Sequence, residues 1–187
     1  MLLMHRSKLL GLLEDYRRRH PAEADTLARF VDFVRAHERC FERDCWAGHV
    51  TGSAWLVNAE RDRVLLTHHK KLGRWLQVGG HSDGVADPLV VAIREAEEES
   101  GLAVVPLETG VFDVDIHEIP ARKSDPAHYH FDVRFALQTS DGDAFAVSDE
   151  SHDLAWVPIE NLDDYTDEES VLRMARKWTR GWLEEAR

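Results

Sequence analysis

Three glutamates, Glu95, Glu98 and Glu99, lie within one short stretch of the chain, directly after Arg94. If this stretch is an α-helix, residues three and four apart share a face, so the three carboxylates fall within an arc of about 100°. Carboxylates crowded in this way repel one another unless a cation lies among them. Mg²⁺ suits the position, because it is a hard ion that binds carboxylate oxygens together with substrate phosphates. A solvated acidic helix face is the alternative interpretation.

The residues around these glutamates extend the pattern. The segment from Gly80 to Leu102 reads GHSDGVADPLVVAIREAEEESGL. It resembles the Nudix box, in which a glycine is followed at fixed distances by Arg-Glu-apolar-any-Glu-Glu-any-Gly-apolar. Two glycines, the arginine and three glutamates fall in register, an agreement that typical residue usage produces with a chance of roughly 10⁻⁷ to 10⁻⁸ per window. Over about residues 48–165, the sequence is therefore similar to the Nudix hydrolase family.

One position departs from the box. The first glutamate of the motif falls on Ala86. Asp83 and Asp87 lie close by, out of register, and either is a candidate substitute. The departure affects one metal contact or supporting carboxylate and leaves the other ligands in place. Val78 also stands where many family members have a proline.

The resemblance implies a role for each matching residue. Glu95, Glu98 and Glu99 correspond to catalytic metal ligands for Mg²⁺, with Mn²⁺ as a substitute, and the backbone of Gly79 and Gly80 helps to complete the site. Arg94 corresponds to the arginine that orients a box glutamate, the kind of support that metal sites need.

Another carboxylate is implied by a second, looser resemblance. Family members often take one from a loop before a Trp-containing strand, and Glu150 stands six residues before Trp156. Glu150 is a candidate for a further metal ligand or for the general base that activates water. Glu95 is the other candidate base, and Asp149 is the alternative loop donor.

Polar and aromatic residues near the box are candidates for substrate contacts. His81 follows the glycine pair directly and is the best placed of four histidines, the others being His117, His128 and His130. His128 and His130 share one strand face and have three interpretations, an extra metal site, a phosphate site or a polar lining of the sheet. The remaining candidates for stacking on a base or holding a phosphate, alongside Gly80, are Trp75, Tyr129 and Arg122.

The function that follows is hydrolysis of a diphosphate linkage by metal-activated water. The expected substrate is a nucleoside diphosphate derivative, such as a nucleotide sugar or a dinucleotide, or else a nucleoside triphosphate. The alternative is a catalytically weakened Nudix-fold module with a nucleotide-binding or regulatory role. Ala86 is the only feature of the sequence that favours this alternative. An isopentenyl diphosphate isomerase needs a reactive cysteine in its pocket, whereas Cys40 and Cys45 precede the first expected strand.

The helices and strands that must position these residues are predicted from hydrophobic periodicity and from the Gly, Pro and capping residues that end such elements. Residues 1–46 are predicted to be helical, divided at Pro21, with apolar stripes that serve the core or a dimer. Strands are expected over 49–57, 63–69, about 74–81, 110–120, 128–138 and 154–159, a helix over 88–100 and a closing helix over about 168–185. This order predicts an α/β fold, which the resemblance specifies as a Nudix-type α/β/α sandwich with a mixed sheet. The predicted organisation is an N-terminal helical extension, 1–46, and a Nudix hydrolase domain, 47–187.

Composition limits the partners. The chain has 187 residues and a formal net charge of −12, which repels polyphosphate backbones, so no nucleic-acid partner is expected. With no apolar stretch of 18 residues, no membrane association is expected and the location is taken as cytoplasmic. The expected partner is a small phosphorylated metabolite, and a homodimer is plausible.

Overall fold

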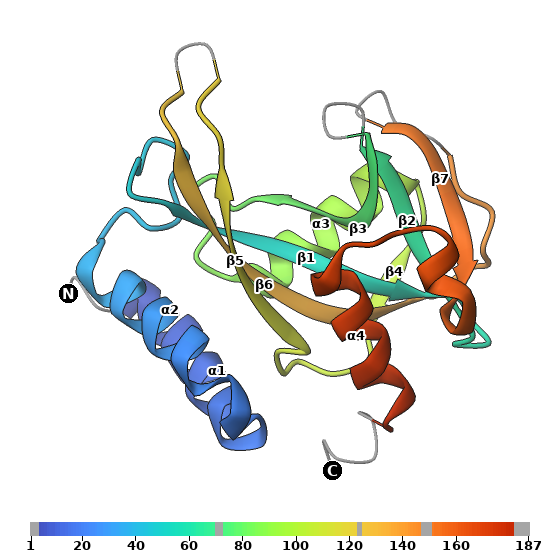
Figure 1. The fold of residues 1–187 in the computed structure, drawn as a ribbon, viewed down its shortest axis with the longest axis horizontal. Helices are drawn as coiled ribbons and strands as arrows, with labels where there is room; N and C mark the ends of the chain where they lie inside the picture. Colours follow the sequence, from blue (N-terminus) through green and yellow to red (C-terminus); the bar gives the residue numbers. More distant parts are fainter. Residues whose placement is uncertain (1–3, 70–72, 123–124, 147–150, 182–187) are drawn as a thin grey trace.

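A computed structural model describes residues 4–69, 73–122, 125–146 and 151–181 (Figure 1). The helices are α1 (Met4–Arg19), α2 (Ala24–Ala36), α3 (Pro88–Ser100) and α4 (Glu169–Thr179), with short 3₁₀ helices η1 (Pro21–Glu23) and η2 (Ile159–Asp164). The strands are β1 (His49–Val57), β2 (Arg63–His69), β3 (Arg74–His81), β4 (Val104–Pro106), β5 (Asp113–Ile119), β6 (His128–Thr139) and β7 (Ser151–Pro158).

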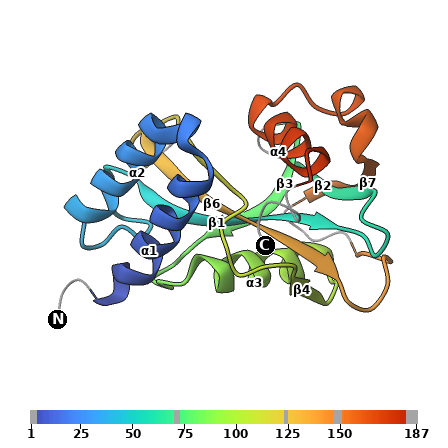
Figure 2. The ribbon, with the colours of Figure 1, turned by 90° about the horizontal axis from the view of Figure 1, so that it is seen from below.

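The strands form one mixed seven-stranded sheet. Its order is β4-β6-β1-β3-β2-β7, and β5 pairs with β6. The central pair, β1 and β6, is parallel, whereas β3 runs antiparallel to β1. Helices α3 and α4 lie on opposite faces of the sheet (Figure 2). The predicted α/β/α sandwich with a mixed sheet is therefore confirmed.

Helix α3 has the bounds that the sequence predicts, because both of its ends carry a residue suited to that end. The Asp87 side chain caps the start by accepting a hydrogen bond from the backbone N–H of Leu89, and Pro88 occupies the first turn. Gly101 ends the helix in the left-handed conformation, with φ of 69°. Gly52 of β1 lets the helix lie close to the sheet, since a Cβ there would meet the Pro88 carbonyl oxygen at 2.7 Å.

The apolar stripes of the N-terminal extension pack within the chain itself. Their fully buried residues join the same core cluster as Val50 and Phe131 of the sheet; they are Leu9, Leu13, Tyr16, Leu27, Phe30 and Val34. Phe33 of α2 stacks on Phe131, with ring centroids 3.7 Å apart. Helices α1 and α2 are thus integral to the core that supports β6.

The prediction of helix through residue 46 is wrong at its C-terminal end. Helix α2 ends at Ala36, and His37 adopts an extended conformation. The chain then folds through turns, and Val50 donates a backbone hydrogen bond to the carbonyl of Cys40 at 2.6 Å. The helix ends here because the next turn offers His37 and Glu38, which continue no apolar stripe. The three-residue strand β4 was also not predicted, because it is too short to show a period.

Both cysteines are free thiols. Cys40 is buried, and burial raises the pKa of its thiol to about 12. A thiol with such a pKa stays protonated at neutral pH and is a poor nucleophile. The Cys40 thiol is therefore poorly suited to the nucleophilic role that an isomerase would require.

Within the described ranges, no helix combines the length and the apolar character needed to cross a membrane.

Candidate active site

The glutamate helix lies against the glycine end of β3. The Gly79 backbone N–H donates a hydrogen bond to Glu99 Oε1 at 2.8 Å. The Glu95 carboxylate lies over Gly80, where a Cβ would fall only 2.2 Å from Oε2. Two predicted ligands and the predicted glycine pair are thus brought together, and the close approach exists because Gly80 has no side chain.

Arg94 fixes the orientation of Glu95. Its Nη2 donates to Glu95 Oε1 and to the backbone carbonyl of His81, both at 2.7 Å. One guanidinium therefore holds a helix carboxylate against the end of β3, directly after the glycine pair. This is the placement that an orienting arginine needs, although the catalytic role of Arg94 stays a prediction.

The donor set fits the divalent metal that the box implies. Glu98, Glu95 and Glu99 all project from α3, and Glu98 is exposed to solvent. The available atoms are carboxylate oxygens, the ligands that Mg²⁺ and Mn²⁺ prefer. The glycine cradle leaves room for these oxygens beside the strand.

Ala86 occupies the position of the first box glutamate, and its environment is apolar. Ala86 lies against the hydrophobic core. Of the two candidate substitutes, Asp87 caps α3 and pairs with Lys8 of α1 at 2.5 Å. Asp83 accepts hydrogen bonds from Arg43, one of them at 2.8 Å, and is exposed. Both carboxylates are paired with cations of the N-terminal region in this arrangement, and a role for either one at the metal site stays a prediction.

We expect Gly80→Ala to lower kcat about 100-fold, because a methyl group would displace the Glu95 carboxylate by an ångström or more. The fold should survive, since the clash meets the far end of a flexible side chain. Steady-state kinetics and a thermal melt of the same sample separate the two effects. Gly11→Ala is the control, because a Cβ at Gly11 meets nothing within 4 Å. Unchanged kcat in Gly80→Ala would contradict the placement of Glu95.

Of the remaining candidates, the described residues Tyr129, Arg122 and Trp75 lie away from the glutamates. Glu150 and Asp149 fall outside the described residues. Tyr129 lies under the guanidinium of Arg29, whose central carbon is 4.4 Å from the ring centroid. Because side chains alternate along a strand, Tyr129 faces away from His128 and His130. Arg122 is exposed and pairs through its backbone with Asp125.

Trp75 lies near the start of β3, away from the glycine pair. Its ring packs beside His68 and Tyr165, with centroids 5.1 and 6.0 Å away, respectively. It lines a cavity of about 290 Å³ together with Gly73, Arg74 and residues 163–167. Three of those residues are aspartates, so the cavity is acidic. Trp75 could stack on an apolar or aromatic group there, but a bare phosphate would be repelled.

Next to the glycine strand, the sheet carries a buried network of polar residues that the sequence analysis missed. Asp132 Oδ1 accepts hydrogen bonds from Thr51 and Ser53, both at 2.8 Å, and Oδ2 accepts one from Arg134 at 2.8 Å. Arg134 also pairs with Asp113 at 3.2 Å. Polar residues at alternate positions of an otherwise apolar strand were the available signal, because alternate side chains share a face.

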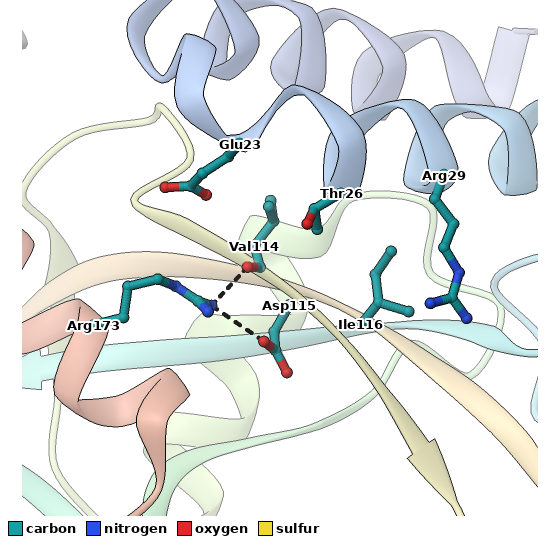
Figure 3. A pocket seen from close by; sticks show the side chains of 7 residues that line it. All are labelled: Glu23, Thr26, Arg29, Val114, Asp115, Ile116 and Arg173. Atoms are coloured by element: carbon teal, nitrogen blue, oxygen red, sulfur yellow. Dashed lines mark hydrogen bonds and ion pairs between the residues drawn. The ribbon is translucent and has the colours of Figure 1, made fainter.

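The network continues to a small cavity between α2, β5 and α4 (Figure 3). Its volume is about 170 Å³. Its charged lining residues are two cations, Arg29 and Arg173, and two carboxylates, Glu23 and Asp115. Arg173 is held by Asp115 at 3.1 Å and by the Val114 carbonyl at 2.9 Å. The cavity is small for a nucleotide, and its Arg173 charge is already compensated by carboxylates.

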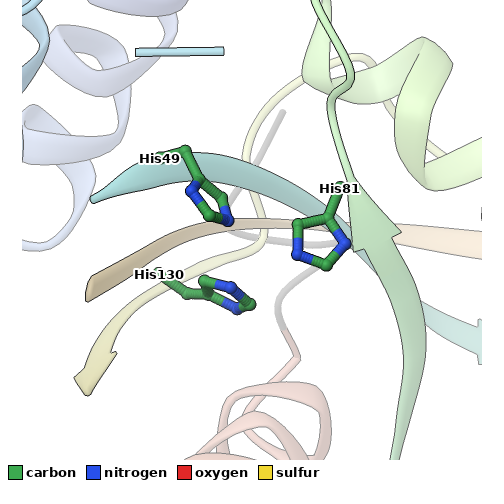
Figure 4. A group of neighbouring side chains, drawn as sticks. All are labelled: His49, His81 and His130. Carbon is green, nitrogen blue, oxygen red and sulfur yellow. The ribbon is translucent and has the colours of Figure 1, made fainter. Parts of the chain in front are cut away.

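Five histidines gather at the end of this polar face. Four of them were singled out from the sequence, and His49 was missed. Their ring centroids form a connected group with spacings of 4.7 to 5.4 Å, the members being His49, His81, His117, His128 and His130. Figure 4 shows three of these rings turned toward one another from β1, β3 and β6. The alternation of His49 with Thr51 and Ser53 was the signal for the missing member.

Two of these imidazoles are held in the neutral form. Burial lowers the pKa of His49 to about 4, with a smaller contribution from His81, His128 and Arg43, which the Cys45 backbone partly opposes. Burial, followed by repulsion from the other histidines, lowers the pKa of His130 to about 2. Both rings are therefore uncharged at neutral pH, with lone pairs available as acceptors or ligands.

The fold and the site together define an α/β/α protein in which a carboxylate-bearing helix lies on a glycine-ended strand. The model of the NUDIX domain matches residues 48–178. The chain belongs to the Nudix family, and its enzyme class is that of the Nudix pyrophosphohydrolases. Among curated proteins, none matches this sequence at a significant level.

Solved structures are similar over most of their own length. An Ap4A hydrolase from C. elegans is 16% identical, with 72% of this chain and 98% of that chain covered and a TM-score of 0.58. A NUDIX-family hydrolase from Clostridium perfringens is 25% identical, with 71% and 97% covered and a TM-score of 0.53. The E. coli dihydroneopterin triphosphate pyrophosphohydrolase is 16% identical, with 68% and 92% covered and a TM-score of 0.55.

Proposed function

We propose that this enzyme is a metal-dependent hydrolase that cleaves a diphosphate linkage in a small phosphorylated metabolite. The substrate class is a nucleoside diphosphate derivative, such as a nucleotide sugar or dinucleotide, or a nucleoside triphosphate. The observation that carries the proposal is the placement of Glu95 and Glu99 on the Gly79–Gly80 backbone, with Arg94 holding Glu95. Mg²⁺ is the proposed cofactor, with Mn²⁺ as a substitute.

Each residue has a task in this proposal. Glu95, Glu98 and Glu99 would hold the metal, which neutralises phosphate charge and lowers the pKa of a coordinated water. Arg94 keeps Glu95 in one orientation through its fixed guanidinium fork. A carboxylate, Glu95 or Glu150, would accept the proton of the attacking water.

The names of the similar solved structures support the reaction class, but they differ in the substrate that is cleaved. The C. elegans protein is named for a dinucleotide and the E. coli protein for a triphosphate, although both are similar to this chain only in fold. The proposed substrate range therefore covers both kinds of compound. The net charge of −12 agrees with a substrate that arrives as a metal complex.

A substrate panel tests the proposal. Nucleotide sugars, dinucleotides and nucleoside triphosphates are incubated with Mg²⁺ or Mn²⁺, and phosphate release is measured directly and after phosphatase treatment. We expect cleavage of one class, abolished by a chelator and restored by added metal. Glu95→Gln and Glu150→Gln then identify the base, because only loss of the base removes the acidic limb of the pH–rate profile.

A weakened binding module is the second candidate. Ala86 favours it, since the residue packs in the core and Asp83 and Asp87 are engaged elsewhere. Calorimetry with the same panel distinguishes the two functions. Tight binding of a nucleotide without turnover in either metal would replace the hydrolase proposal by this one.

A further inference from the structure

The histidine cluster lies on a different side of β3 from the glutamates. Neighbouring residues of a strand point to opposite faces, and Gly80 faces Glu95 of α3. The His81 side chain therefore points to the other face, toward His49 and His130, whose ring centroids are both 5.1 Å from its own. The cluster is close to the carboxylate site but separate from it.

Sheet pairing brings three of the rings together. Strands β6, β1 and β3 are neighbours, His49 pairs with His130, and His81 pairs with Thr51, two residues along β1. One nitrogen from each of His49, His81 and His130 lies within 4.8 Å of the others (Figure 4). Nitrogens bound to one tetrahedral metal are about 3.4 Å apart when each bond is about 2.1 Å. Binding an ion would require the three side chains to rotate so that their nitrogens come closer together.

Three buried nitrogens of the cluster, two in His49 and one in His130, lack a hydrogen-bond partner among the described residues. Although the Cys45 backbone is close enough to affect its pKa, His49 is 2% exposed and neither of its ring nitrogens makes a hydrogen bond of normal geometry in the described structure. The same holds for Nε2 of His130. Buried polar atoms without partners are uncommon in folded proteins and point to a missing water or ion.

The surrounding histidines favour an ion over water. His128 Nδ1 lies 2.9 Å from the Pro126 carbonyl, which can only accept, so the neutral form of the ring has its proton on Nδ1 and its lone pair on Nε2. His117 Nδ1 lies 3.1 Å from the Asp115 carboxylate, with the same consequence. Several lone pairs thus meet in one place, and a water molecule can donate to only two of them. A carbonyl or carboxylate behind an imidazole is also the usual support of a metal-bound histidine.

We infer that His49, His81 and His130 form a binding site for a transition-metal ion of the Zn²⁺ class, distinct from the carboxylate site of the box. Imidazole nitrogen suits Zn²⁺, Co²⁺, Ni²⁺ or Cu²⁺, whereas Mg²⁺ prefers oxygen. Three protein nitrogens leave a fourth position for His128 or for an external oxygen. Through the His81 carbonyl, Arg94 connects this site to Glu95.

Metal titration tests the inference without any activity measurement. Tag-free protein is stripped with a chelator and titrated with Co²⁺, whose visible spectrum reports nitrogen ligands, and then with Zn²⁺ by calorimetry. With millimolar Mg²⁺ present to fill the carboxylate site, we expect one further ion per chain to bind at micromolar metal. X-ray absorption of the Zn²⁺ protein should show imidazole scattering, a result that needs no variant.

Variants locate the ion. His81→Gln, at a half-buried position, and His49→Gln should each weaken Zn²⁺ binding at least about tenfold. His5→Gln, at an exposed position outside the cluster, and Glu98→Gln should leave it unchanged. The inference is overturned by absence of stoichiometric binding, by a spectrum without imidazole, by binding that tolerates both cluster variants, or by loss of binding in Glu98→Gln.

Discussion

Glu98→Gln should lower kcat/KM for diphosphate hydrolysis about 10³-fold, a loss of about 4 kcal/mol of transition-state stabilisation. The exchange keeps the size of the side chain but replaces one carboxylate oxygen with an NH₂ group and removes the negative charge that holds a divalent cation. Glu98 is exposed on α3, so the substitution should not alter folding. Initial rates measured over a range of Mg²⁺ concentrations, with the best substrate of the panel, provide the test.

Glu97→Gln is the matched control, because it makes the same change of charge on the adjacent exposed residue of α3. The box accepts any residue at position 97, so the hydrolysis rate of Glu97→Gln should remain within about twofold of the parent. Equal losses in both variants would indicate a general electrostatic effect of the helix and would remove Glu98 from the metal site.

Arg134→Ala should destabilise the fold by about 3–5 kcal/mol, because it leaves the buried Asp132 carboxylate without its ion-pair partner and removes one of the cations around Asp113. Arg134 is 1% exposed, and its guanidinium contacts Asp132 and Asp113 at 2.8 and 3.2 Å. Asp113 is fully buried, and the nearby cations, Arg173 first, hold the pKa of its carboxyl below the usual value despite desolvation. Urea denaturation at neutral pH, followed by tryptophan fluorescence, measures the difference.

Arg176→Ala provides the comparison. Arg176 pairs with Glu169 on the surface of α4, where both side chains are largely solvated, and exposed pairs contribute only about 0–1 kcal/mol. If Arg134→Ala unfolds at the same urea concentration as Arg176→Ala, the buried network does not support the fold. Complete failure of Arg134→Ala to fold would agree with the expected direction.

The site on α3 was predictable because its information is local. The register of Gly80, Arg94 and the glutamates identifies the box, and Asp87, Pro88 and Gly101 fix the helix that carries it. The helix period alone places the carboxylates on one face. Strand periodicity and turn residues likewise predicted six of the seven strands, and Pro21 correctly separated the two N-terminal helices.

The contacts of the N-terminal region could not be predicted from local sequence patterns. An apolar stripe predicts that α2 packs against something, but not that Phe33 stacks on Phe131 of β6. Likewise, the spacing of Asp83 and Asp87 from the box made each a candidate substitute for the missing glutamate. Their ion pairs with Arg43 and Lys8 arise from contacts with an extension far away in sequence.

The sequence by itself determined the family, the α/β class, the carboxylate helix and its glycine strand, because each depends on residues that are close together along the chain. Only the tertiary structure decided that His49, His81 and His130 meet, since they lie on three strands whose order and register no local pattern fixes. It also decided that Asp113 and Asp132 share one buried arginine. The pairing of strands that are distant in sequence determines which of these residues are neighbours. Burial then strengthens the electrostatic interactions among them, because the interior has a low dielectric constant.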